Sequence, residues 1–224
     1  MAGNLSGSTS IGFQASGTGR VISNFALTHF AAASEFADKT AGVEKEHTGQ
    51  ALGNFWQEIS IYWSAAIMSS VAALESLINE LYLQTNSPLQ KVDGEFDEFF
   101  WGKNGLERKP ILHKYQTALA QLGMEPFIQD SEPYAAVETL IGLRNYIVHF
   151  KPLFDEERRN EDLEAKLVDR FELSPIPDDG ADFVTKKCVS GGCARWAVES
   201  SRSFICTFAD LSGLDKKKLS AFAN

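Results

Sequence analysis

The chain has 224 residues, and 44% of them are hydrophobic, which is enough to bury the core of one domain. Its formal net charge of −9 argues against a general nucleic-acid binder, because such proteins usually carry a basic surface; any contact with RNA therefore requires a local basic cleft. Its three cysteines form no CxxC pair and offer too few ligands for zinc, which indicates reduced thiols in a cytoplasmic protein and no metal site.

The sequence shows no targeting segment and no membrane span. Residues 1–21 are rich in Gly, Ser and Thr and lack the apolar region of a secretory signal, so they predict a flexible arm. The most apolar segment, residues 61–74, contains three serines and is shorter than the roughly 20 residues that a membrane span needs. We therefore expect a cytoplasmic protein without membrane contact, and a single helical domain over residues 22–224.

Two helices are predicted in the first half of the chain, over residues 22–45 and 52–84, with a polar connection between them. The second is apolar on most of its circumference, and a helix of that kind is buried by more than one neighbour. In a chain of this size, a second copy of the protein would supply the extra cover.

The middle of the chain predicts two further helices. Residues 93–105 mix aromatic, acidic and glycine residues, which indicates a short helix and a loop. Pro110 and Gly123 have the spacing of a first helical residue and of the residue just past a helix end, so they predict a helix over residues 110–122.

The next helix is expected to begin at a capping serine, Ser131, and its apolar residues follow the 3/4 spacing of an amphipathic helix. Its end is predicted near Phe150, because Lys151 precedes a proline and the residue before a proline disfavours the α region. This helix carries the polar motif described below.

The tail of the chain is predicted to extend the bundle. Residues 155–171 are highly charged with apolar residues at helical spacing, which indicates a surface helix. Residues 172–192 predict a long loop, and residues 193–209 an amphipathic helix before a short basic stretch at 216–218. No alternating strand pattern persists anywhere, so the predicted fold class is all-α, a helical bundle with a C-terminal helical extension.

Three polar residues lie within two turns of the helix that ends near Phe150. Arg144 falls inside an apolar series, where a cation must reach solvent, find a partner or line a cleft. Asn145 and His149 are four residues apart and so share one face of the helix. On physical grounds alone, a histidine at such a position is more often a cap or a core hydrogen bonder than a catalyst.

A second polar pair, Glu75 and Asn79, is four residues apart on the long apolar helix. It has two interpretations: a solvated edge, or a pair in which Glu75 faces Arg144 across the bundle and holds the guanidinium, as a buried arginine requires. The sequence leaves both open.

The segment Arg144-Asn145-Tyr146-Ile147-Val148-His149 resembles the RNxxxH signature of HEPN domains (higher eukaryotes and prokaryotes nucleotide-binding). Residues 73–82 (ALESLINELY) are similar to the helix that precedes the motif helix in that family, with its acidic residue. The resemblance covers roughly residues 50–155 of this chain. It implies a small all-α bundle and, as in many members, a metal-independent endoribonuclease of a toxin–antitoxin, phage-defence or RNA-processing system.

The resemblance also implies a homodimer in which Arg144, Asn145 and His149 of two chains form one cleft. There the histidines would move protons, the arginines would offset phosphate charge, and the products would be a 2′,3′-cyclic phosphate and a 5′-hydroxyl, with no cofactor. The implied partners are RNA, a second copy, and a cognate antitoxin or defence partner. Members paired with a nucleotidyltransferase antitoxin often carry a tyrosine where this chain has Lys151, so that partnership is in doubt, and Lys151 is instead assigned to contact phosphate.

Two alternatives to a nuclease stay open: a non-catalytic HEPN-like dimer that binds a nucleotide or a protein, and an all-α scaffold with a purely structural Arg144–Glu75 pair. A basic and aromatic stretch before and within residues 110–122 resembles an RNA-contacting surface, but a solvated helix end explains it better. Its members are Trp101, Lys103, Arg108, Lys109, His113, Lys114 and Tyr115. His113 has no carboxylate beside it on its helix face, so we do not expect it to be catalytic.

Overall fold

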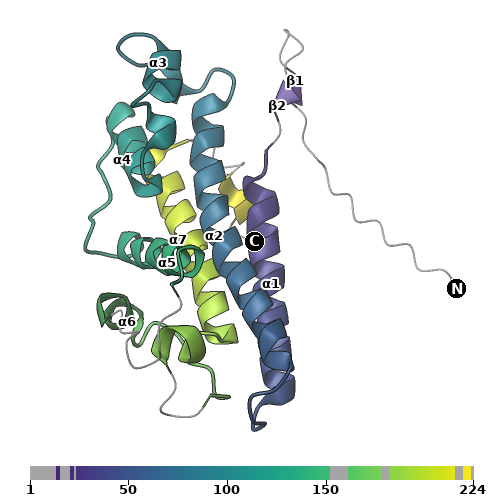
Figure 1. Ribbon diagram of the computed structural model, residues 1–224. Coiled ribbons are helices and arrows are strands. Elements are labelled where there is room, and N and C mark those ends of the chain that lie inside the picture. The colour runs from purple at the N-terminus through teal and green to yellow at the C-terminus, as the bar shows by residue number, and fades with distance from the viewer. Residues whose placement is uncertain are drawn as a thin grey trace, which may run out of the picture.

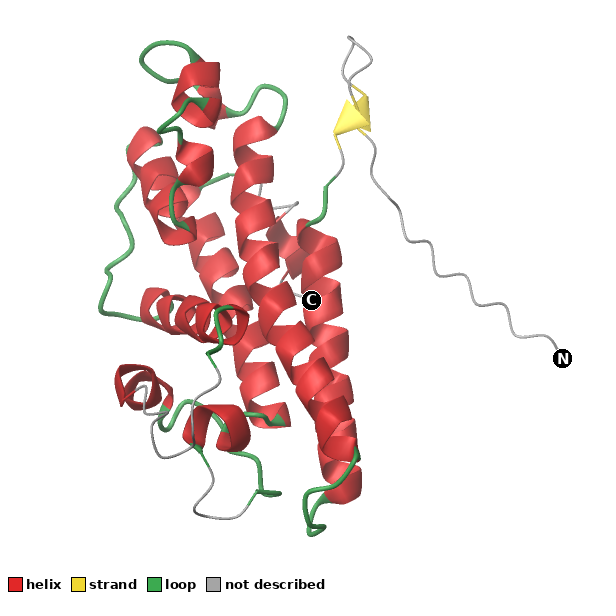
Figure 2. Ribbon diagram, viewed as in Figure 1, coloured by secondary structure: helices red, strands yellow, loops and turns green. Residues whose placement is uncertain are grey.

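The structure is a computed structural model that describes residues 14–15, 21–22, 24–151, 161–177, 182–214 and 219–222. Figure 2 shows that the described chain is mostly helical, so the predicted all-α fold class is confirmed. One exception to the predicted absence of strands is a two-residue antiparallel pair, β1 (Gln14–Ala15) with β2 (Val21–Ile22). The rest of the predicted N-terminal arm and the basic stretch 216–218 lie outside the described residues.

Three long helices form the body of the bundle and lie side by side (Figure 1). They are α1 (Ala26–His47), α2 (Phe55–Leu83) and α7 (Gly191–Ser212). The first two confirm the helices predicted over residues 22–45 and 52–84, except that α1 begins at Ala26 and Ile22 lies in β2. The third begins two residues before the predicted start at residue 193, because Ser190 caps it by accepting a hydrogen bond from the Cys193 nitrogen at 2.9 Å.

Helix α2 is the centre of the core, because it packs against α1, α4, α5 and α7. Its length and apolar composition alone would suffice to cross a membrane, yet 50% of its most apolar window is buried inside the bundle. A nearly all-apolar helix is buried by several neighbours, as its sequence predicts. Two of its large apolar side chains, Ile61 and Met68, are nevertheless exposed by 55% and 41%.

The helices that follow α2 in the sequence lie on one side of it (Figure 1). They are the short α3 (Phe96–Trp101), α4 (Ile111–Gln121) and α5 (Tyr134–Val148). Pro110 is the N-cap of α4 and not its first helical residue, so the helix begins one residue later than predicted. Gly123, just past the helix end, has φ +68°, which favours glycine. Helix α5 runs across the direction of the long helices in Figure 1.

The boundaries of α5 differ from the prediction at both ends. Ser131 does not cap the helix, because its hydroxyl donates to the Ile128 carbonyl at 3.1 Å and Pro133 occupies the N-cap position. The helix ends at Val148, so His149 is the C-cap residue and lies just beyond the last turn. His149, which was predicted on a face of the helix, therefore lies at the helix end.

The tail adds α6 (Glu161–Leu167), which packs on α5, and a π-helical turn, Phe183–Lys187, inside the segment predicted as a long loop. The predicted surface helix over residues 155–171 ends at Leu167, and residues 155–160 lie outside those described. Gly191 is the first residue of α7. A Cβ there would lie 2.8 Å from Ala41 of α1, so glycine at this position permits close contact between the two helices.

Candidate functional site

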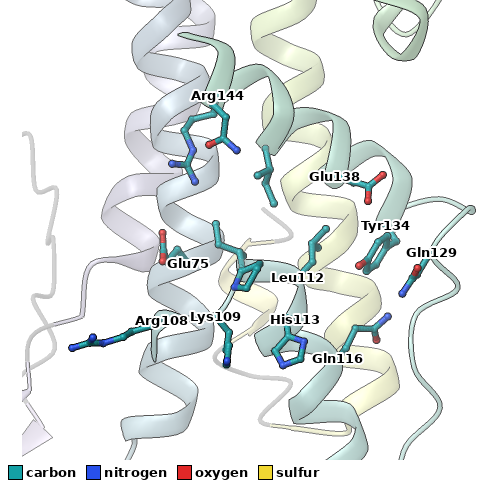
Figure 3. A pocket seen from close by; sticks show the side chains of 14 residues that line it. Glu75, Arg108, Lys109, Leu112, His113, Gln116, Gln129, Tyr134, Glu138 and Arg144 are labelled. Atoms are coloured by element: carbon teal, nitrogen blue, oxygen red, sulfur yellow. The ribbon is translucent and has the colours of Figure 1, made fainter. Parts of the chain in front are cut away.

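An open cleft of about 710 Å³ lies between α2, α4 and α5. Its wall from α2 contains Glu75, its wall from α4 and the residues before that helix contains residues 108–113 and Gln116, and α5 supplies Arg144 and Asn145 (Figure 3). A volume of this size is typical of ligand-binding clefts, which take roughly 300–1,000 Å³. The cleft thus brings together polar residues from three separate parts of the chain.

Arg144 lines the cleft, as one of the three sequence-based expectations for this residue requires. Its side chain is partly buried, and its Nε atom is buried with no hydrogen-bond partner in the described part of the chain. A buried donor without a partner destabilises a fold by about 1–3 kcal/mol, and such groups in native proteins call for an explanation. Because Nε is covered, a ligand in the cleft would have to bind the other nitrogens of the Arg144 guanidinium.

The structure brings together two of the three motif residues, not all three. Asn145 is exposed and lines the cleft with Arg144. His149 is exposed as well, but it caps the end of α5 and is not among the cleft-lining residues. Its backbone nitrogen donates to the Asn145 carbonyl at 2.9 Å, so the two residues are joined through the main chain. Lys151 follows the helix end as an exposed residue, also outside the lining.

Glu75 has a different partner from the one that the sequence suggested. Among the described residues its ion pair is with Lys114 of α4, whose Nζ atom lies 3.5 Å from Glu75 Oε1. The same Nζ donates to Asn79 Oδ1 at 3.0 Å. Glu75 and Asn79, one turn apart on α2, therefore act together on a lysine whose side chain is fully buried. The hypothesis of a Glu75–Arg144 ion pair is not met.

Two residues of the basic and aromatic stretch are buried, although the sequence favoured a solvated helix end for all of it. Lys114 and Tyr115 are both 0% exposed, and the Tyr115 hydroxyl donates to the Leu74 carbonyl of α2 at 2.8 Å. Sequence reasoning missed that Arg108, Lys109 and His113 line the same cleft as Arg144. Lys109 precedes the N-cap of α4, so helical spacing could not have shown that it lies beside His113.

The cleft has a local excess of positive charge on an acidic protein. Three cations line it (Arg108, Lys109 and Arg144), of which Arg108 lies 3.8 Å from Glu107 outside the cleft, against two carboxylates (Glu75 and Glu138). Both carboxylates have lysine partners that do not line the cleft: Glu75 pairs with Lys114, and Glu138 lies 3.7 Å from Lys166. The side of the cleft that a ligand would meet is therefore suited to an anion, in spite of the overall charge of −9.

The cysteines do not contribute to this site. Cys188 and Cys193 are buried near the start of α7, and Cys206 is half-buried within it. Burial raises the pKa of the Cys193 thiol to about 12 and raises that of Cys188 still further above its ordinary value. Neither thiol is a nucleophile near neutral pH. The described residues contain no group of three or more His, Cys, Asp or Glu side chains placed to hold a metal ion.

The chain matches no protein-family model, no curated protein and no solved structure. An all-α bundle hosts many unrelated activities, so the fold does not select one of them. An assignment of function therefore depends on the cleft and on the motif residues themselves.

Proposed function

We propose that the protein is a metal-independent endoribonuclease of the HEPN type, and that the cleft between α2, α4 and α5 binds the RNA backbone. One observation supports this above the others: Arg144 lines the open cleft beside Asn145, and its buried Nε has no partner among the described residues. A guanidinium binds a phosphate through two parallel hydrogen bonds, and it keeps its charge at every physiological pH. The surplus of cations in the cleft favours the same ligand.

The proposed reaction needs no group beyond the side chains of the motif. A base removes the proton of the ribose 2′-hydroxyl, and the 2′-oxygen forms a bond to phosphorus while the bond from phosphorus to the 5′-oxygen breaks. An acid gives its proton to the leaving 5′-oxygen, which yields a 2′,3′-cyclic phosphate and a 5′-hydroxyl. Imidazole serves both proton transfers near neutral pH, and Arg144 offsets the charge that develops on the phosphoryl oxygens. The Asn145 amide donates to one of those oxygens.

A second copy of the chain completes the proposed site. His149 lies at the exposed end of α5, outside the cleft of its own chain. The apolar side chains on either side of it, Val148 and Phe150, are exposed by 46% and 42%, and a second copy would cover them. In this proposal the two α5 ends meet around a two-fold axis, so that two imidazoles and two guanidiniums face one RNA strand.

The test is cleavage of a fluorescent single-stranded RNA by the purified protein, with and without EDTA. We expect the wild-type protein to cleave with EDTA present, and Arg144→Ala and His149→Ala to lower the rate by about 10²–10⁴-fold. Asn145→Ala should have a smaller effect. The control is His29→Ala, a histidine on α1 away from the cleft, which should leave the rate unchanged. Loss of cleavage in EDTA, or equal rates for all variants, would contradict the proposal.

In cells, the proposed activity would act on cytoplasmic RNA, as in a toxin or phage-defence system. Expression of the wild-type chain should then arrest growth, while expression of His149→Ala at the same level should not. Growth arrest by both proteins alike would argue against RNA cleavage as its cause.

A non-catalytic HEPN-like module that binds a nucleotide or a protein is the second candidate. The position of His149 outside the cleft of its own chain favours it, because anion binding by Arg144 does not require that histidine. This candidate expects RNA binding without cleavage, and equal behaviour of the wild-type protein and His149→Ala. The same cleavage assay therefore separates the two.

A further inference from the structure

Lys114 is a fully buried cation next to the cleft, and the proposed reaction does not use it. Its Nζ atom has two partners among the described residues, both on α2: Asn79 Oδ1 at 3.0 Å and Glu75 Oε1 at 3.5 Å. An ammonium group inside a protein needs a counter-charge, because it has lost its hydration. Glu75 provides that charge, although its own side chain is 46% exposed at the cleft.

Glu75 is also the α2 carboxylate that shares the cleft with Arg144. Figure 3 shows the Glu75 carboxylate and the Arg144 guanidinium on the same side of the cleft. A carboxylate and a guanidinium that meet in a partly buried site form a two-point hydrogen-bonded pair, and this pair would compete with a phosphate for the same donors. In the structure, Glu75 is instead paired with Lys114, and the Arg144 Nε has no partner among the described residues.

We infer that Lys114 is a positioning residue: it holds Glu75 against α4 and so keeps the Arg144 guanidinium available to a phosphate group of the RNA. The identity of the ligand depends on the proposed function, whereas the competition between Lys114 and Arg144 for one carboxylate does not. Without Lys114, Glu75 pairs with Arg144 and the cleft loses its strongest anion-binding group. Removal of Glu75 as well then frees Arg144 again.

This inference predicts that the effects of substitutions at Lys114 and Glu75 on binding are not additive. A simple loss of the Lys114 charge would give additive effects. In the wild-type background, Lys114 already neutralises Glu75, so Glu75→Gln should raise affinity for an anionic ligand only about 2-fold. In the Lys114→Met background, the same substitution should raise affinity by about 10-fold or more. If Lys114 acted only through its distant charge, Glu75→Gln would have the same effect in both backgrounds.

The experiment measures binding of a fluorescein-labelled 2′-O-methyl oligoribonucleotide by anisotropy. This probe has no free 2′-hydroxyl and cannot be cleaved by the proposed reaction. The proteins are the wild type, Lys114→Met, Glu75→Gln and the double variant. The matched control is Lys109→Met with and without Glu75→Gln, because Lys109 lines the cleft but is not the ion-pair partner of Glu75. In that control, Glu75→Gln should have its small wild-type effect.

Circular dichroism establishes that each variant folds. If Lys114→Met does not fold, it is replaced by Lys114→Gln, which keeps a donor for Asn79 without the charge. A purely structural Lys114 would lower affinity in a way that Glu75→Gln cannot restore, and that result would overturn the inference, as would a wild-type protein that does not bind the probe. If the wild type fails to cleave ordinary RNA and the interaction is still found, the nuclease proposal fails and the role of Lys114 stands.

Discussion

Oε1 of Glu80, on α2, accepts a hydrogen bond from the backbone nitrogen of Ala26, the first residue of α1, at 2.8 Å. The same atom accepts from the Phe25 nitrogen at 2.7 Å. The N-cap residue of α1 has no side-chain hydrogen bond of its own, so a carboxylate from another helix satisfies two of the N–H groups that a helix start leaves unpaired. This contact ties the start of α1 to the central helix of the bundle.

Substitution of Glu80 by alanine should therefore destabilise the protein by about 0.5–2 kcal/mol, the range measured for lost helix caps. Glu58→Ala, at an exposed glutamate in the first turn of α2, is the matched control and should change stability by less than about 0.5 kcal/mol. Urea unfolding followed by circular dichroism measures both. Equal stabilities of the two variants would show that the cap contributes nothing.

The contact between α1 and α7 predicts opposite effects of one substitution at two glycines. A Cβ on Gly191 would lie 2.8 Å from Ala41, so Gly191→Ala forces the helices apart and should cost about 1–3 kcal/mol. Gly42 lies beside Ala41 in α1 but has open space around it, and Gly42→Ala should stabilise the protein by about 0.5–1 kcal/mol. Thermal unfolding of the two variants checks the signs, and a shift in the same direction for both would be inconsistent with this packing.

Two buried tyrosines should make the fold sensitive to alkaline pH. Burial, with a smaller contribution from the charge of Glu80, raises the pKa of Tyr115 well above its ordinary value, and burial also raises that of Tyr82. Above about pH 10 the unfolded chain loses these protons while the folded chain keeps them. The stability that the two tyrosines contribute is therefore complete below that pH and falls above it by about 1.4 kcal/mol per pH unit for each tyrosine. Urea titrations between pH 8 and 11.5 measure the slope.

In the variant Tyr82→Phe, the loss of stability above about pH 10 should be less steep, because one of the groups whose pKa burial raises is gone. The control is Tyr62→Phe, at a tyrosine that is partly exposed and stacks on Phe36. An identical pH dependence of the wild type and the Tyr82 variant would refute the role of burial.

The proposed dimer predicts that a charge at the exposed end of α5 abolishes both assembly and cleavage. Val148 is 46% exposed next to His149, so Val148→Glu would place a carboxylate inside the proposed interface. Val168, just past α6, is 44% exposed, and Val168→Glu should change neither property. Light scattering after size-exclusion chromatography gives the mass, and the RNA assay gives the rate. If the Val148 variant stays dimeric and active, the interface lies elsewhere.

The cations that line the cleft just before α4, Arg108 and Lys109, predict the salt dependence of RNA binding. If Lys109 contacts a phosphate, Lys109→Met should lower the slope of log affinity against log salt by about 0.7, the value for one contact with a single strand. Lys103 is an exposed lysine after α3 that does not line the cleft, and Lys103→Met should leave the slope unchanged. Anisotropy with the 2′-O-methyl probe at several salt concentrations measures both slopes. A slope that stays at the wild-type value would remove Lys109 from the binding surface.

Most helices were predictable from the sequence because their signals are local. The continuous apolar pattern around residues 52–84 identifies α2, and Pro110 with Gly123 places α4 to within one residue at each end. The same signals failed at two helix starts, where a different local hydrogen bond forms. Ser131 has the chemistry of a cap but donates to the Ile128 carbonyl instead, and α7 begins at Gly191 because Ser190 accepts from the Cys193 nitrogen.

The site could be predicted in part only. The position of Arg144 in an apolar series indicated a cation that reaches solvent, finds a partner or lines a cleft, and in the structure it lines a cleft. The partner of Glu75 and the place of His149 could not be found in this way, because they depend on how three helices cross.

The pattern of apolar and polar residues along the chain was sufficient for an all-α bundle and for a polar motif near the end of one helix. It did not predict the cleft, because Lys114 and Glu75 are 39 positions apart in the sequence and Arg144 lines the same cleft from a third helix. Periodicity specifies which face of a helix is apolar, but the packing of the whole core sets the crossing of helices, and that crossing selects which charged side chains meet.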